Sequence, residues 1–272
     1  MNLRLSLINF VNALPLQWGF MRGGFPESFD IAYDLPSRCA DRLSEGDADV
    51  GLIPAVEYQR IEGLRIIPGM AIASKKQVKS VLFVSKKPIQ QVQTVALDTS
   101  SRTSAVLTRL LLRRKFFLRP EYRAGEPDLP GMLEHNDSAL IIGNPALLVE
   151  RDRYYVFDLV EQWVEMTGKP FVFAFWAARD AAPVEPLLHR FVESKAHGLS
   201  HLEEIADYAV THLPVSRPVI LDYLEEKLNY DLDVDNLAGL ELFYQLAAGE
   251  GLLPPPRALH FVQGAGKTAT GS

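Results

Sequence analysis

The amino-terminal stretch of this chain places an apolar strand directly before a helix start, and this junction strongly constrains the fold. Apolar residues of strand length run from Leu3 to Val11, and Pro15 then suits the first turn of a helix, where its missing N–H costs nothing. Asn12 therefore falls at the carboxyl end of a strand, where open α/β sheets bind ligands. Its amide both donates and accepts hydrogen bonds without carrying charge. The alternative is that Asn12 only shapes the turn or caps the helix.

The composition predicts a folded protein that binds a small molecule. The chain has 272 residues, 47% of them hydrophobic, which is enough to bury one large core or two smaller ones. Its formal net charge of −6 gives no electrostatic reason to bind nucleic acid or an anionic membrane. Because we find neither a secretory signal nor an apolar stretch of membrane-spanning length, we expect a cytoplasmic protein. The sequence leaves both a monomer and a homodimer open.

Cysteine and histidine give no sign of metal or nucleophilic chemistry. Cys39 is the only cysteine, and its place in an amphipathic helix favours a packing role. The six histidines show no metal-ligand spacing, so we expect neither a metal nor a cofactor. The GKT at 266–268 lacks the glycine spacing and the preceding strand of a phosphate-binding loop, and it lies in a polar tail, 264–272, that we expect to be mobile.

Alternating strand and helix patterns predict an α/β fold with an inserted second lobe. Strand patterns lie at 29–33, 50–53, 80–84, 94–97, 139–142 and 171–178. A helix at 37–44 between the first two gives a βαβ rhythm. We expect a first lobe of residues 1–84 and 180–272, an inserted second lobe of residues 85–179, and a functional site in the cleft between them.

The carboxyl-terminal part is predicted to be almost wholly helical and to pack back on the first lobe. Helical spacing of apolar residues defines segments at 187–198, 201–212, 219–228 and 234–249. Large apolar side chains before this region are expected in the core and not in the cleft, because such residues usually bury there. They are Trp163, Met166, Phe173 and Trp176.

A run of small hydroxyl residues joins one short strand to the helix that begins near Ser101. Thr99, Ser100 and Ser101 are good helix caps, and Thr103 and Ser104 fall on the first turn. The free N–H groups of a first turn and the positive end of the helix dipole make a natural carboxylate site. Taken alone, an ordinary capped helix is the more common explanation of such a run.

A third junction repeats the arrangement at Asn12. The strand in LIIGNPALL ends at Gly143 and Asn144 before Pro145 starts a helix, so a close backbone approach and an amide face the same crevice as the hydroxyl run. Three such junctions with neutral polar groups predict a cleft for a small polyoxygenated acid. Because no triad of nucleophile, base and orienting group is visible, a reaction here would rest on positioning, with the substrate as a candidate source of the base.

Several motifs together resemble those of the menaquinone biosynthetic family of the futalosine pathway. In chain order they are INFVNALPL, GDADVGLIPAVEY, SVLFVSKKPI, VALDTSSRTSAVLTRLLL, IIGNPALL, DLVEQWVEMTGKPFVFAFWAAR and LNYDLDVDNLAGLELFYQLAAGEGLL. The resemblance spans nearly the whole chain. It implies the two-lobed fold of type II periplasmic binding proteins, each lobe a mixed sheet flanked by helices. It also implies a carbon–oxygen lyase that eliminates water from chorismate to give 3-[(1-carboxyvinyl)oxy]benzoate.

The resemblance implies roles for the residues of the cleft. Asn12 would orient and polarise the reacting part of chorismate, and Ser80 would hydrogen-bond a substrate oxygen. Substrate binding would also involve Ser101, Thr103, Ser104, Gly143 and Asn144. Asn144 stands where relatives are expected to carry an acidic residue, which puts a base at this position in doubt.

Two other functions stay open at this level. A non-catalytic protein that binds a small acid would share the fold, although we find no secretory signal. The sister enzyme 1,4-dihydroxy-6-naphthoate synthase would be expected to use a histidine base, and no histidine lies in the motifs. For a binding protein and an enzyme alike we expect the lobes to close over the ligand, with hinges near 84–87 and 177–180.

Overall fold

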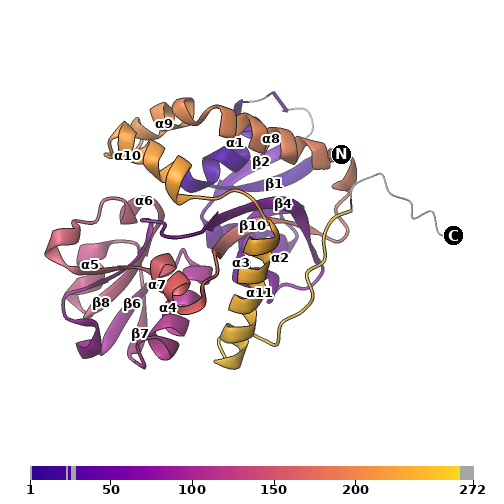
Figure 1. Cartoon of the computed structure of the whole chain (residues 1–272). Coiled ribbons are helices and arrows are strands. Elements are labelled where there is room, and N and C mark those ends of the chain that lie inside the picture. Colours follow the sequence, from indigo (N-terminus) through magenta and orange to yellow (C-terminus); the bar gives the residue numbers. More distant parts are fainter. Residues whose placement is uncertain (1, 23, 26–28, 264–272) are drawn as a thin grey trace.

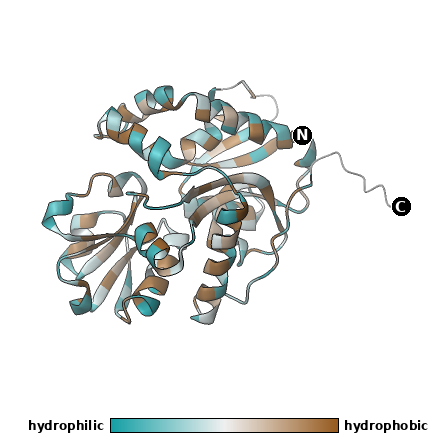
Figure 2. Ribbon diagram, viewed as in Figure 1, coloured by the Kyte–Doolittle hydropathy of each residue, from teal (hydrophilic) through white to brown (hydrophobic). Residues whose placement is uncertain are grey.

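Two five-stranded sheets, each covered by helices, form the two lobes of the computed structural model (Figure 1). The structure describes residues 2–22, 24–25 and 29–263, so the expected polar tail at 264–272 lies outside the described residues. Hydrophobic residues concentrate on the strands and on the helix faces that cover them (Figure 2). The predicted α/β class with two lobes and mixed sheets is confirmed.

The first sheet has the strand order β2-β1-β3-β10-β4. Its strands are β1 (Leu3–Ile8), β2 (Phe29–Asp34), β3 (Val50–Pro54), β4 (Leu64–Ser74) and β10 (Phe171–Arg179). β1 runs parallel to β2 and β3, whereas β10 is antiparallel to β3 and β4. β1 ends earlier than the apolar run suggests, because Val11–Ala13 already forms a 3-10 turn that leads into the next helix.

The second sheet has the strand order β7-β6-β8-β5-β9. Its strands are β5 (Val81–Ser85), β6 (Thr94–Asp98), β7 (Glu121–Gly125), β8 (Ser138–Ile142) and β9 (Tyr155–Asp158). β6 is parallel to β7 and β8, and β5 is antiparallel to β8 and β9. Each sheet therefore carries one reversed strand, β10 or β5, next to an edge strand.

These two reversed strands shift the lobe boundaries from the expected positions after residues 84 and 179. β5 lies in the second sheet, and β10 lies between β3 and β4 in the first. The chain crosses between lobes at residues 75–80 and at 168–170, so the stretches expected as hinges lie at strand ends. Both strands are buried on both faces, so their sequences show no alternation of apolar and polar residues. Without such alternation, the sequence does not indicate which sheet each strand joins.

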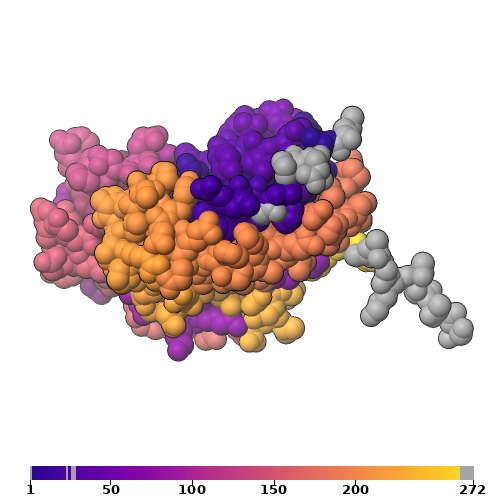
Figure 3. Space-filling view, turned by 90° about the horizontal axis from the view of Figure 1, so that it is seen from above, coloured from indigo at the N-terminus to yellow at the C-terminus, as the bar shows by residue number. Residues whose placement is uncertain are grey.

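Helices of the first lobe come from both ends of the chain. They are α1 (Leu14–Arg22), α2 (Pro36–Glu45), α3 (Ala55–Tyr58), α8 (Leu188–Ser200), α9 (Leu202–Val210), α10 (Arg217–Asp222) and α11 (Val234–Gly249). Seen from above, the residues of α8 to α10 lie beside the amino-terminal residues (Figure 3). α1 and α8 touch closely, because a Cβ atom at Gly198 would lie 2.0 Å from the Pro15 carbonyl oxygen.

Helices of the second lobe cover its sheet, and one helix of the first lobe joins them. They are α4 (Arg102–Arg114), α5 (Leu129–Glu134), α6 (Gly143–Ala146) and α7 (Leu159–Thr167). α11 packs against β10 in the first lobe and against α4 in the second (Figure 1). The predicted helix at 219–228 is observed as α10 followed by a π-helical turn, Tyr223–Lys227.

Candidate functional site

A cavity of about 490 Å³, part of it open to solvent, lies between the two lobes. The lining residues come from strand ends and helix starts of both lobes: Ile8, Phe10, Asn12, Pro36, Pro54, Ile72, Ser80, Val81, Ser101, Thr103, Ser104, Ile142, Gly143, Phe173 and Ala174. All three predicted junctions therefore meet at one place.

Asn12 lies in the 3-10 turn between β1 and α1, where it lines the cavity. Its Oδ1 is buried and has no hydrogen-bond partner among the residues that the structure describes. A buried amide oxygen without a partner costs about 1–3 kcal/mol. This oxygen is therefore available to accept a hydrogen bond from a ligand in the cavity.

Ser80 lies at the crossover into the second lobe and is buried. The Tyr223 hydroxyl, from the π-helical turn, donates to Ser80 Oγ at 2.7 Å. Burial raises the pKa of Tyr223 well above its ordinary value, and hydrogen bonds with Ser80 and Asn12 oppose this only in part. The phenol therefore stays a proton donor, which leaves the Ser80 O–H free to point to a substrate oxygen.

Asp158 fixes the backbone just before Ser80. Its Oδ2 accepts from Val78 N at 3.0 Å and from Lys79 N at 2.6 Å, while Oδ1 accepts from Val160 N and Glu161 N at the start of α7. Lys79 has a φ of 63°, in the left-handed region that a side chain disfavours. Asp158 thus compensates for a strained turn that sets the direction of Ser80.

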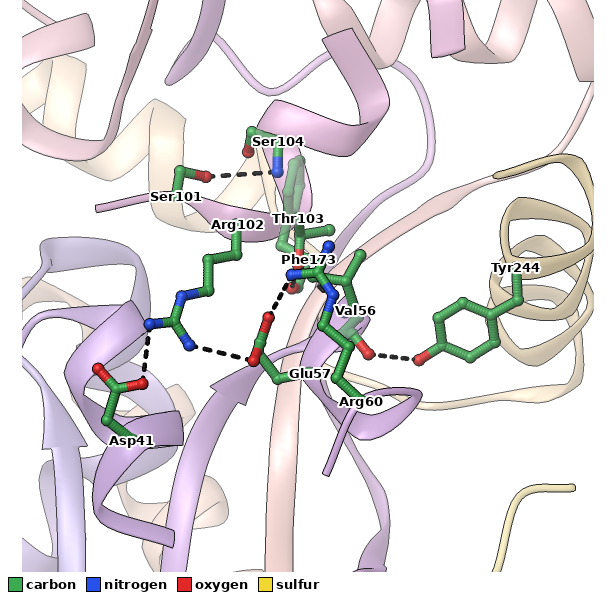
Figure 4. Close-up of polar contacts among 11 residues, drawn as sticks. Asp41, Val56, Glu57, Arg60, Ser101, Arg102, Thr103, Ser104, Phe173 and Tyr244 are labelled. Atoms are coloured by element: carbon green, nitrogen blue, oxygen red, sulfur yellow. Dashed lines mark hydrogen bonds and ion pairs between the residues drawn. The ribbon is translucent and has the colours of Figure 1, made fainter. Parts of the chain in front are cut away.

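The hydroxyl groups of the first turn of α4 make different hydrogen bonds (Figure 4). Ser101 caps the helix and accepts from Ser104 N at 3.3 Å, and both residues line the cavity. The Thr103 hydroxyl lines it too, but it donates to the Phe173 carbonyl oxygen at 3.1 Å and accepts from Val56 N at 3.4 Å. Thr103 thus joins the lobes, and its O–H is already used.

Gly143 and Asn144 occupy different positions at the third junction. Gly143 lines the cavity with a φ of +63°, its N–H donates to the Ser80 carbonyl oxygen at 2.8 Å, and the Phe10 ring leaves no room for a Cβ atom. Asn144 is not among the lining residues. Its Oδ1 accepts from Val11 N at 3.2 Å, so this side chain ties the second lobe to the turn that carries Asn12.

Arg102 holds the same turn of α4 to the first lobe through two carboxylates (Figure 4). Its guanidinium donates to Asp41 Oδ1 at 2.8 Å, on α2, and to Glu57 Oε2 at 3.0 Å, on α3. Arg60 contacts the other oxygen of Glu57 at 2.7 Å. Sequence reasoning missed both Arg102 and Tyr223, although the arginine inside a run of hydroxyl residues was a usable signal.

The cavity wall carries no ionisable side chain among the lining residues. All six histidines lie in the described part of the chain, and none lines the cavity. Burial raises the pKa of the Cys39 thiol to about 12, so Cys39 is a neutral packing residue. Trp163 and Trp176 lie in the core as expected, whereas Phe173 contributes both to the core and to the cavity.

Within the described ranges, no group of three His, Cys, Asp or Glu residues is arranged to hold a metal ion. In the same part of the chain, no helix has both the length and the apolar character needed to cross a membrane. The groups that can contact a ligand in the cavity are therefore neutral donors and acceptors: the Asn12 amide, the Ser80, Ser101 and Ser104 hydroxyls, and the backbone.

Known proteins similar to this chain include enzymes and binding proteins. A family model described as menaquinone biosynthesis matches residues 3–249. A chorismate dehydratase of Thermus thermophilus is 29% identical over 258 residues, 88% of this chain and 93% of that protein. Another, of Campylobacter jejuni, is 26% identical over 194 residues, 69% of this chain and 73% of that protein.

Solved structures share the fold at lower identity. A protein of Archaeoglobus fulgidus has a TM-score of 0.79 at 17% identity, covering 93% of this chain and 98% of that one. The periplasmic aliphatic sulphonate binding protein of Escherichia coli has a TM-score of 0.63 at 18% identity, covering 93% and 94%. The expected periplasmic-binding-protein-like fold is confirmed.

Proposed function

Because this chain belongs to the menaquinone biosynthesis family, we propose that it is a hydro-lyase that converts chorismate to 3-[(1-carboxyvinyl)oxy]benzoate. Two relatives, which match 88% and 69% of this chain, are chorismate dehydratases. This supports chorismate as the substrate and the loss of water as the reaction. The cavity between the lobes is the proposed site. Its hydroxyl and amide groups suit a small acid with several oxygen atoms.

The observation that carries the mechanism is the absence of an ionisable side chain among the residues that line the described cavity. A base must come from elsewhere, and a carboxylate of chorismate, that of the enolpyruvyl group, is close to the ring in the substrate itself. This carboxylate takes a ring proton, and the electron pair of the broken C–H bond forms a ring double bond. The C–O bond to the 4-hydroxyl breaks, and the departing hydroxide takes the proton from the newly formed carboxylic acid and leaves as water, which restores the carboxylate. The ring becomes aromatic, which drives the elimination.

The protein would contribute mainly by holding the enolpyruvyl group in the reactive conformation. Well-oriented intramolecular reactions gain about 7 kcal/mol or more from such positioning. In this proposal Asn12 and Ser80 hydrogen-bond the reacting part of chorismate, with Ser80 held by Tyr223. The second carboxylate lies at the first turn of α4, against Ser101 and Ser104 and the positive end of the helix.

The test is to incubate the purified protein with chorismate and follow the aromatic product by ultraviolet absorbance and mass. We expect turnover, and we expect Asn12→Ala to lower kcat/KM by about 100-fold, as for the loss of a group that contacts the reacting atoms. Asn9→Ala is a matched control, because Asn9 is an exposed asparagine on the same loop. Binding of chorismate without turnover would identify a binding protein, and neither binding nor turnover would contradict the proposed substrate.

The source of the base needs a separate measurement. A chorismate analogue whose enolpyruvyl carboxylate is an amide keeps the shape of the substrate but removes the proposed base. We expect this analogue to compete with chorismate and to release no water. If it is converted at the rate of chorismate, the base belongs to the protein or to the solvent, and the mechanism is wrong.

A further inference from the structure

A second cavity, lined mostly by residues of the second lobe, lies outside the site described above. It is bounded by α4, by β7 at the sheet edge and by the loop that follows α11, and it contains about 920 Å³ of space, part of it open to solvent. Ser101 borders both cavities, but the other lining residues differ. Apart from Ser101, no residue that lines the second cavity has a role in the proposed reaction.

Arg109 is the one arginine of this cavity wall for which no hydrogen bond or ion pair to a described residue is found. Its guanidinium stacks over the Tyr122 ring, 4.3 Å from the ring centroid, and no hydrogen bond or ion pair joins it to another described side chain. The other arginines on the wall all have carboxylate partners: Arg60 with Glu57, Arg102 with Asp41 and Glu57, and Arg123 with Glu121. The donors of Arg109 are therefore available to an anion.

Two further polar atoms of the wall are buried and unpaired within the described chain. They are the Tyr122 hydroxyl and Asp98 Oδ2. Asp98 is 2% exposed, and its other oxygen accepts from the Ser100 N–H and hydroxyl. Burial raises the pKa of both the Asp98 carboxyl and the Tyr122 phenol. The Tyr122 phenol is a neutral donor on the cavity wall, and each unpaired atom costs about 1–3 kcal/mol unless something binds it.

Part of the remaining wall is apolar and includes Leu97, Val106 and Leu252 as well as the Tyr122 ring. An inorganic ion would leave this surface uncovered, whereas a planar organic anion would cover it. A guanidinium matches a carboxylate by two parallel hydrogen bonds. We propose that this cavity is a second ligand site, which takes a small aromatic carboxylate with its charged group on Arg109 and its ring against the apolar wall.

The test uses benzoate as the probe and the amide spectrum of the isotope-labelled full-length protein as the readout. We expect benzoate to shift the amide signals of residues that line the cavity, such as Ala105 and Ala124. Arg109→Gln should raise the dissociation constant for benzoate at least about tenfold, as expected when a charge-assisted pair is lost. Arg153→Gln is the matched control, because Arg153 also contacts an aromatic ring in this lobe, Tyr154, but outside the cavity.

Three outcomes would overturn the assignment. No shift at up to roughly 10 mM benzoate, which detects millimolar affinity, would mean that only water fills the cavity. Shifts at Asn12 and Ser80 in place of Ala105 and Ala124 would mean that benzoate enters the cavity between the lobes. Equal affinity for inorganic phosphate and benzoate would mean that the apolar wall contributes nothing. Because no outcome depends on turnover, the assignment and the proposed reaction fail separately.

Discussion

The Tyr223 hydroxyl orients the Ser80 hydroxyl, which lines the cavity. Removing this one hydroxyl group measures its effect on the reaction. Tyr223→Phe removes the donor to Ser80 Oγ and lets the serine O–H turn away from the substrate. We expect kcat for chorismate to fall about tenfold to 100-fold with a smaller change in KM, because about 1–3 kcal/mol of positioning is lost.

The matched control is Tyr58→Phe. Tyr58 is also buried, and its hydroxyl donates to Ala258 O and accepts from His260 N, but Tyr58 is not among the residues that line the cavity. This control should lower stability with kcat unchanged. Equal losses of kcat in both variants would assign Tyr223 to packing alone.

The residues of the cavity were predictable where a local motif places them. Asn12, Ser101, Ser104 and Gly143 line one cavity, because each stands at a strand end or a helix start. Ser80, which precedes β5, was expected only from the family resemblance. The sequence does not show which partner each hydrogen-bonding group takes in the folded protein. The Thr103 hydroxyl and the Asn144 amide are both spent on contacts between the lobes, and such contacts depend on backbone atoms far away in the chain.

At the scale of elements, Asp158 connects the end of β9, the start of α7 and the crossover before β5. Asp158→Asn keeps the size of the side chain but turns one acceptor into a donor, so two of the four backbone N–H groups lose their partner. We expect the free energy of unfolding in urea to fall by about 3 kcal/mol, the cost of buried donors without acceptors.

Asp128→Asn provides the comparison, since Asp128 caps α5 through one N–H at an exposed position. Asparagine and aspartate are equivalent helix caps, so this variant should change stability by less than about 0.5 kcal/mol. If the two substitutions cost the same, Asp158 is an ordinary cap and does not fix the strained Lys79.

Elements with a clear apolar period were predictable, and three strands were not. β4 has Pro68 and Gly69 in its middle, which are typical of a turn. β7 and β9 are edge strands and largely lack buried side chains, so they show no apolar run. The π-helical turn at 223–227 follows α10 without any break in the helical pattern, which is why Tyr223 was not singled out.

For the whole molecule, Arg102 joins three helices across the gap between the lobes. Arg102→Met removes its contacts with Asp41 and Glu57 but keeps an apolar stem of similar length. Because the pair with Asp41 is partly exposed, we expect the arrangement of the lobes seen here to lose only about 1 kcal/mol relative to a more open one, a roughly fivefold change in population. X-ray scattering of the ligand-free protein should show a larger radius of gyration.

Arg38→Met is a suitable control, because Arg38 pairs with Glu45 on the surface of α2 within one lobe. It should leave the scattering curve unchanged. Compaction in the Arg102 variant, or an equal change in the control, would contradict a role of Arg102 in closure.

The position of β10 inside the first sheet also orders events while the chain is being made. All strands of the second sheet lie within residues 81–158, so they can pair as soon as that stretch has left the ribosome. The first sheet must wait for β10, and until then β3 presents an open edge and β4 has no neighbour. The domain that begins the chain is therefore the last to finish, and its unpaired strands are a natural client surface for chaperones during that delay.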